Sequence, residues 1–151
     1  MAQSLAQVYL HIVFSTKDRY PWLKTKRLQT DVHAYVAATL NKMDCPCVIA
    51  GGVEDHIHIL CRLGRTVTIA DLVRDIKKAS TNMLTDRSQE SHGFRWQKGY
   101  GAFSISPAHV EPLKKYILNQ EQHHHKEKFQ DEYRRLLEKY GVDYDERYVW
   151  D

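Results

Sequence analysis

The sequence lacks several features that mark whole classes of protein. It has only three cysteines in 151 residues, an odd number that argues against a disulfide framework. No stretch approaches the roughly 18 apolar residues that a membrane-spanning helix needs. The opening segment MAQSLAQVYLHIVF alternates apolar and polar residues, unlike a secretory leader. We therefore expect a cytoplasmic protein in which Cys45, Cys47 and Cys61 are reduced, structural thiols.

The net charge is also small, and nucleotide-binding motifs are missing. The formal net charge is only +3, which is too small to indicate nucleic-acid binding by itself. The glycine–lysine motif of a phosphate-binding P-loop is absent, so we expect no nucleotide cofactor. Because no repeat, low-complexity tract or linker divides the chain, its length suits a single domain, residues 1–151.

Hydrophobic periodicity predicts four strands and four helices. The strands are expected at about 7–15, 45–51, 55–63 and 101–106, and the helices at about 26–43, 69–83, 109–126 and 130–140. Thr68 is the expected N-cap of the second helix, and Gly141 the stop of the last. The order of the first six elements fits an α+β, ferredoxin-like antiparallel sheet, βαββαβ, with two helices on one face. The additional C-terminal helices could cover the other face or reach a partner.

The segment DHIHIL carries two histidines on an expected strand. His56 and His58 are two residues apart and therefore point to the same face of a sheet, while Ile57 and Ile59 point to the other. Two imidazoles can hold one divalent ion when a third ligand comes from elsewhere. The same pattern also fits two half-exposed histidines without a metal.

A tyrosine and a glutamine share one face of the expected helix 109–126. Tyr116 and Gln120 are four residues apart. The phenol can attack a phosphate, and the amide oxygen can complete a metal shell. Alone, each also has a plain explanation, because a helical tyrosine often packs beside neighbours such as Ile117 and a helical glutamine is usually solvated.

Together these motifs resemble a single-tyrosine HUH transposase of the insertion-sequence-200-like family. HUH denotes histidine, bulky hydrophobic residue, histidine, which matches His56-Ile57-His58. The family's downstream tyrosine, with a glutamine one turn later, matches Tyr116 and Gln120. The segments VYLHIVFSTK, GGVEDHIHIL, WQKGYGAFS and YILNQ resemble family blocks in the same order, from about residue 8 to residue 120.

The resemblance implies a magnesium or manganese ion held by His56, His58 and Gln120. It implies Tyr116 as the nucleophile, joined to cleaved single-stranded DNA through a 5′-phosphotyrosine. It also implies a homodimer and a DNA hairpin at the element end as the recognised substrate. A domesticated relative that acts on repeated palindromes would keep the same residues, and the general base is not identified.

Other polar residues are candidates for supporting roles. His11 would share the face of His56 and His58 as an alternative ligand, an outer-shell partner or an ordinary strand histidine. The run 123–125, three histidines pointing in different directions around a helix, favours a solvated or interface role over a metal site. Single strands are held by cationic and aromatic side chains, and the cationic candidates are Lys17, Arg19, Lys77, Lys78, Arg95 and Lys98.

Three alternative functions stay open. A replication initiator or conjugative relaxase would use the same chemistry, but relaxases generally place the tyrosine ahead of the histidines, whereas Tyr116 follows His58 by 58 residues. A non-catalytic single-stranded nucleic-acid-binding module can share the ferredoxin-like fold. In a simple metal hydrolase, water would attack and Tyr116 would only pack.

Overall fold

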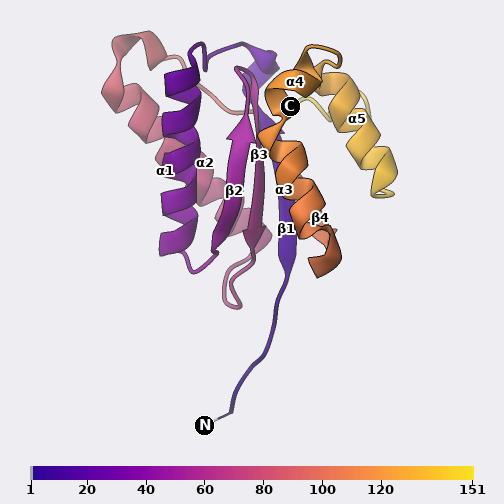
Figure 1. Cartoon of the computed structure of the whole chain (residues 1–151). Coiled ribbons are helices and arrows are strands. Elements are labelled where there is room, and N and C mark those ends of the chain that lie inside the picture. Colours follow the sequence, from indigo (N-terminus) through magenta and orange to yellow (C-terminus); the bar gives the residue numbers. More distant parts are fainter. Residues whose placement is uncertain (1) are drawn as a thin grey trace.

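Four antiparallel strands form the centre of the molecule in a computed structural model that describes residues 2–151 (Figure 1). Their order across the sheet is β2-β3-β1-β4, and every neighbouring pair is antiparallel. The strands are β1 (Tyr9–Ser15), β2 (Cys47–Gly52), β3 (His56–Arg62) and β4 (Gly101–Ile105). This order, with a helix after β1 and another after β3, confirms the ferredoxin-like α+β fold.

The first face of the sheet is covered by α1 (Lys26–Lys42) and α2 (Ile69–Arg87). Both helices begin at a threonine whose side chain accepts a backbone N–H bond, Thr25 from Leu28 and Thr68 from Asp71, each at 3.1 Å. These bonds satisfy backbone donors that the first helical turn leaves unpaired. The apolar core between sheet and helices contains Ile12, Phe14, Val32, Val36, Leu40, Ile57, Ile59, Leu72 and Ile76, all at most 1% exposed.

The second face of the sheet is covered by the C-terminal helices α3 (Val110–Leu118), α4 (Gln120–His124) and α5 (Phe129–Lys139) (Figure 1). Of the two possibilities left open by the sequence, covering this face is the one observed. α5 packs an apolar stripe on the β1–β4 half, where Val13, Phe103, Phe129, Tyr133, Leu136 and Leu137 form a second buried cluster. α3 lies against β2 and β3. The boundary between α3 and α5 therefore runs above the centre of the sheet.

Three stretches differ from the sequence prediction or refine it. The expected helix 109–126 is two helices, because Asn119 departs from helical geometry (φ −98°, ψ 18°) and the chain turns there. The second helix is expected at about 69–83, but α2 continues as far as Arg87, whose guanidinium pairs with Asp31 of α1 at 2.6 Å. Gly141 ends α5 as expected: its φ is +67°, and the next N–H donates to the Leu137 carbonyl at 2.9 Å.

The three cysteines form no disulfide, and no described helix could span a membrane. Cys45, Cys47 and Cys61 are free thiols. Burial raises the pKa of Cys47 to about 11 and that of Cys61 to about 12, which keeps both protonated. Among the described residues, the helices are all too short or too polar to cross a bilayer.

Candidate active site

The two histidines of β3 lie on the second face of the sheet, as the strand alternation predicts. His56 and His58 are both fully buried. Each uses its Nδ1 on a neighbour: His56 lies 2.7 Å from Asp55 Oδ1, and His58 lies 2.8 Å from His11 Nε2. Both Nε2 atoms are thereby directed at the C-terminal helices. A partner on the far nitrogen is how proteins fix the orientation of a metal-binding imidazole.

His11 lies against the Nδ1 side of His58, which matches an outer-shell partner, one of the three roles that the sequence left open. It contacts His58 and is not among the residues whose ligand atoms cluster closely enough to hold one ion.

Gln120 and Glu132 meet the two Nε2 atoms from the opposite side. Gln120 Oε1 lies 2.8 Å from His56 Nε2, and Glu132 Oε1 lies 3.0 Å from His58 Nε2. The two side chains are also bonded to each other, because the Gln120 amide donates to Glu132 Oε2 at 3.0 Å. Both are buried, at 1% and 0% exposure. A carboxylate and an amide thus close the histidine cluster.

Tyr116 reaches the same carboxylate within one chain. Its hydroxyl donates to Glu132 Oε2, and it accepts a bond from Arg135 at 2.9 Å. The guanidinium of Arg135 is held in turn by Glu127 at 2.9 Å. The close approach of α3 depends on Gly51 of β2, where a Cβ atom would lie only 2.8 Å from Ile117 Cγ2. Tyr116 and His58 therefore share the Glu132 carboxylate, with Tyr116 on Oε2 and His58 on Oε1.

The local electrostatics favour neutral imidazoles at His11 and His58 and an ionised carboxylate at Glu132. Burial lowers the pKa of His58 and of His11, and neutral imidazole is the form that binds metal. Burial alone would raise the pKa of Glu132, but His58 and the hydrogen bond from His124 outweigh it and hold that pKa well below its usual range. Burial and the Glu132 charge raise the pKa of Tyr116, against the smaller opposing effect of Arg135.

The donor set fits a divalent metal ion. His56, His58 and Glu132 each offer a ligand atom, and these atoms lie within 4.8 Å of one another. Gln120 Oε1 adds an amide oxygen beside them. Two imidazole nitrogens with a carboxylate and an amide oxygen suit a divalent ion that accepts mixed nitrogen and oxygen ligands.

His124 and Glu132 were not assigned to this site from the sequence. For His124, the expected solvated role was wrong. His124 is no solvated side chain: it lies 3.1 Å from Glu132 Oε1, and its ring packs on that of His56 with centroids 4.3 Å apart. Glu132 carried a usable signal. It lies on the apolar stripe of α5, three residues after Phe129 and four before Leu136, where an acidic residue has no packing reason to be.

The cationic candidates for DNA contact lie in two places. A shallow groove of about 360 Å³ between α2 and the 94–98 segment is lined by Lys77, Lys78, Arg95 and Lys98, and the Lys17 N–H bonds to the Arg95 carbonyl nearby at 2.8 Å. Arg19 lies apart from these, in a hollow that it shares with Asp55 and His124 at the edge of the histidine cluster.

Lys77 is the least free of the six. Its ammonium donates to the carbonyls of Gln97, Lys98 and Gly99, and burial lowers its pKa to about 8. Contact with a phosphate would require Lys77 to exchange those bonds.

The chain is similar in sequence to one protein family. Residues 4–120 match the family model described as Transposase IS200 like. No curated protein matches the chain. The match ends at Gln120, so Glu132 and Arg135 lie beyond it.

Two solved structures are similar in fold. A candidate transposase from Deinococcus radiodurans R1 has a TM-score of 0.61 and 19% identity, over 80% of this chain and 95% of that one. A REP-associated tyrosine transposase bound to a REP hairpin has a TM-score of 0.52 and 13% identity, over 78% of this chain and 67% of that one. At these identities the likeness concerns the fold.

Proposed function

The chain belongs to the IS200-like transposase family, and we propose on that premise that it cleaves and rejoins single-stranded DNA with Tyr116 as the nucleophile. One observation carries the proposal. The Tyr116 hydroxyl and the His58 imidazole meet on the two oxygens of the same buried carboxylate, Glu132. The alternative in which Tyr116 only packs gives no reason for its hydroxyl to reach the histidine cluster.

His56, His58 and Glu132 would hold a magnesium or manganese ion, with Gln120 Oε1 as a further ligand. An ion bound there supplies positive charge to the scissile phosphate and to the charge that develops on it. Asp55 and His11 fix the imidazole orientations from behind. In this proposal Gln120 stays a metal ligand, as the resemblance implies, and Glu132 is an additional ligand that the resemblance does not include.

Tyr116 needs help to act as a nucleophile. A phenol with pKa of about 10 costs about 4 kcal/mol to ionise at pH 7, and burial here raises that cost. The proton is therefore best transferred as the bond to phosphorus forms, when the phenol oxygen becomes far more acidic. Glu132 Oε2, which accepts the hydrogen bond of the Tyr116 hydroxyl, would receive the proton, and Arg135 donates to the Tyr116 oxygen.

In the proposed cleavage, the Tyr116 oxygen replaces the 3′ oxygen of the strand on the scissile phosphorus. The Tyr116 oxygen bonds to phosphorus, the bond from phosphorus to the 3′ oxygen breaks, and that oxygen leaves as a 3′-hydroxyl after taking a proton from solvent. The product is a 5′-phosphotyrosine. Rejoining reverses the exchange with a 3′-hydroxyl as the attacking group, and because one phosphodiester replaces another, no nucleotide is consumed.

We further propose a bacterial, cytoplasmic enzyme that recognises hairpin-bearing single strands and works as a homodimer. The proposal of hairpin recognition draws on the family and on the similar structure, which is bound to a REP hairpin. Because Tyr116 contacts the site of its own chain, the proposed reaction does not need helix exchange between subunits.

Covalent trapping tests the function. Wild-type protein incubated with hairpin-bearing single-stranded DNA and Mn²⁺ should give a protein–DNA adduct that survives denaturant. Tyr116→Phe should abolish the adduct, while Tyr35→Phe, a change at an exposed tyrosine of α1, should leave it intact. His58→Ala should lose cleavage but keep part of its DNA binding, which rests mainly on phosphate contacts.

Three results would contradict this proposal. Binding without any adduct would favour the non-catalytic module. An adduct in Tyr116→Phe would mean another nucleophile. Full cleavage in the presence of chelator would remove the metal from the proposal.

A further inference from the structure

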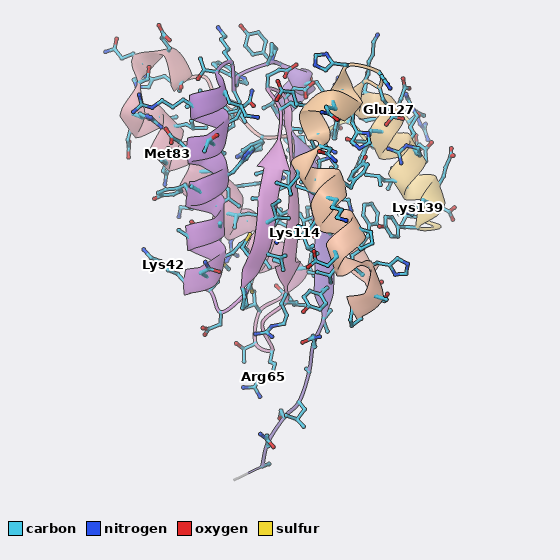
Figure 2. The ribbon with its side chains drawn as sticks, in the orientation of Figure 1. Lys42, Arg65, Met83, Lys114, Glu127 and Lys139 are labelled. Atoms are coloured by element: carbon cyan, nitrogen blue, oxygen red, sulfur yellow. The ribbon has the colours of Figure 1, made fainter. Side chains whose placement is uncertain are left out.

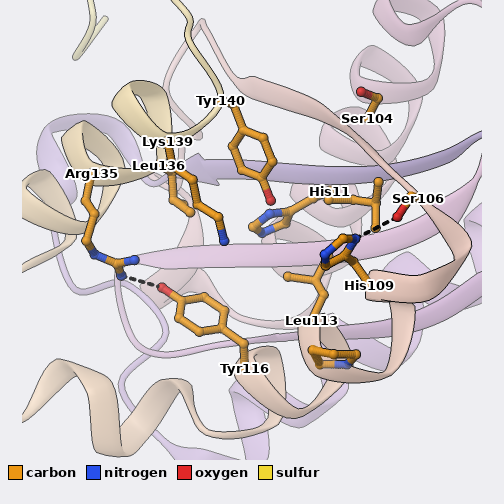
Figure 3. A pocket seen from close by; sticks show the side chains of 12 residues that line it. His11, Ser104, Ser106, His109, Leu113, Tyr116, Arg135, Leu136, Lys139 and Tyr140 are labelled. Carbon is orange, nitrogen blue, oxygen red and sulfur yellow. Dashed lines mark hydrogen bonds between the residues drawn. The ribbon is translucent and has the colours of Figure 1, made fainter.

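A cavity that the proposed chemistry does not use lies beside Tyr116 (Figure 3). Its volume is about 390 Å³, and it lies between α3, α5, His11 of β1 and the end of β4. Tyr116 and Arg135 line one end, and Ser106 and His109 line the other (Figure 3). Ligand pockets in proteins span about 300–1,000 Å³, so this one suits a single nucleotide better than a larger group.

The floor of the cavity contains a buried polar atom without a partner. His11 is fully buried, and its Nε2 is taken up by His58 at 2.8 Å. Its Nδ1 has no hydrogen-bond partner within residues 2–151. Buried polar atoms are almost always bonded, and His11 lines the cavity, so its unpaired Nδ1 is a candidate partner for a polar group of a ligand.

The tautomer of His11 follows from its neighbour. When His58 directs an unprotonated Nε2 at a metal, its own Nδ1 carries the proton and donates to His11 Nε2. The proton of neutral His11 is then on Nδ1, which becomes a donor.

The walls add cations and an aromatic surface. Figures 2 and 3 place Lys139 at the far end of α5, with its side chain extending toward His11 in the close-up. Its ammonium lies 5.6 Å from the centroid of Tyr140, whose ring is stacked on Phe103 at 4.5 Å. With Arg135 at the Tyr116 end, the two charged side chains that line the cavity, Arg135 and Lys139, are both hydrogen-bond donors without acceptor atoms.

From this arrangement we propose that the cavity binds one nucleotide of the substrate strand, the one whose 5′-phosphate is transferred to Tyr116, and that it prefers a keto base. The inference rests on the proposed function. The transferred phosphate bonds to the Tyr116 oxygen at the rim of the cavity, so the attached nucleotide is the one within reach. Thymine O4 and guanine O6 are acceptors for the donors of Lys139 and His11, whereas cytosine and adenine carry an amino group at the corresponding ring position.

Adduct sequencing tests this subsite. The protein is incubated with Mn²⁺ and a pool of single strands in which the segment beside a hairpin is randomised. Denaturant-resistant adducts are isolated, the protein is digested, and each attached strand is read to its 5′ end, which identifies the transferred nucleotide. In wild-type adducts the ratio of thymine and guanine to cytosine and adenine at this position should be about tenfold higher than in the pool, the discrimination expected of a good contact to a base edge.

Matched lysine variants separate the subsite from general DNA affinity. Lys139→Ala should still form adducts but lose most of the enrichment. Lys115→Ala removes an exposed lysine of α3 that does not line the cavity, and it should keep the enrichment even if fewer adducts form. Both are exposed positions, so neither change should disturb folding.

The outcomes distinguish the two proposals. No adduct from any strand would overturn the proposed function, and the subsite with it. Adducts with an even base composition at the 5′ end, or enriched in cytosine or adenine, would overturn the subsite alone. So would an enrichment that Lys139→Ala leaves unchanged.

Discussion

β3 sends alternate residues into two different environments. Ile57 and Ile59 enter an apolar core under α1 and α2, where they meet Ile12 and Phe14. His56 and His58 enter a hydrogen-bonded cluster under α3, α4 and α5. Both sets are fully buried, so the faces differ in chemistry and not in exposure.

The difference shows what each face requires. Apolar side chains need only volume and contact, and their burial is favourable in itself. Buried imidazoles and carboxylates lose hydration, so each needs partners in exchange. On the second face the histidine and glutamate side chains bond to one another, and such clusters are weak evidence for stability. We conclude that Ile57 and Ile59 chiefly stabilise the fold, whereas burial of His56 and His58 is explained by the proposed function and not by stability.

The largest expected effect on folding comes from the first face. Ile59→Ala should lower the free energy of unfolding by about 2–5 kcal/mol, because it removes buried methyl groups and leaves a cavity. Ile59→Val should cost only about 0.5–1.5 kcal/mol. Urea unfolding measures both. If Ile59→Ala weakened Mn²⁺ binding as strongly as a change to a ligand does, the two faces would not be separable.

Glu132→Gln should show the reverse pattern. It keeps the size of the side chain but removes the carboxylate that lies between the imidazoles and Tyr116. We expect Mn²⁺ affinity to fall by at least about 10–100-fold, the range seen when even outer-shell partners are lost. Calorimetric titration measures the affinity, and Glu127→Gln is the matched control outside the ligand cluster. Equal affinities for the two variants would remove Glu132 from the ligand set.

The fold and half of the site follow from local sequence patterns. The alternation of residues 56–59 predicts which side chains share a face, and helical spacing places Tyr116 beside Gln120. Periodicity could not locate the break at Asn119, because it depends on how the chain turns to bring Gln120 onto the sheet.

Glu132 and His124 were missed for a different reason. They lie on separate helices, eight residues apart, and meet only because α5 folds back onto the sheet. No spacing rule within one element links them to β3, and Glu132 lies beyond the region that carries the family motifs. A search for charged residues on apolar helix faces would have identified Glu132, since it interrupts the stripe of α5 between Phe129 and Tyr133.

Acidification should destabilise the protein mainly through the buried ionisable groups of the second face. Burial lowers the pKa of His11 and His58 from 6.5, and the histidine contacts lower that of Glu132 from 4.5. A lowered pKa means that the unfolded chain binds more protons, so stability falls as pH drops below about 6.5 and falls further below about 4.5. His124, whose pKa is raised, opposes part of this.

The expected slope is about 1.4 kcal/mol per pH unit for each proton taken up on unfolding. Urea unfolding between pH 7.5 and pH 5 measures it without added metal. His33 on α1 also has a lowered pKa, about 4, through burial. His33→Gln removes that contribution, and a slope that vanished in this variant would mean that the second face adds nothing.

The smallest expected effects concern the N-terminal caps of α2, on the first face, and α5, on the second. Thr68→Ala should lower the free energy of unfolding by about 1 kcal/mol, because the Asp71 N–H loses its acceptor, and Thr68→Ser should restore it. Lys128, at the start of α5, makes no side-chain cap bond, so Lys128→Ala should cost nothing by that route. α5 is held in place by the burial of Phe129 and Leu136 against the sheet. If Lys128→Ala cost as much as Thr68→Ala in urea unfolding, α5 would depend on its end as α2 does, and packing alone would not explain how Glu132 is positioned.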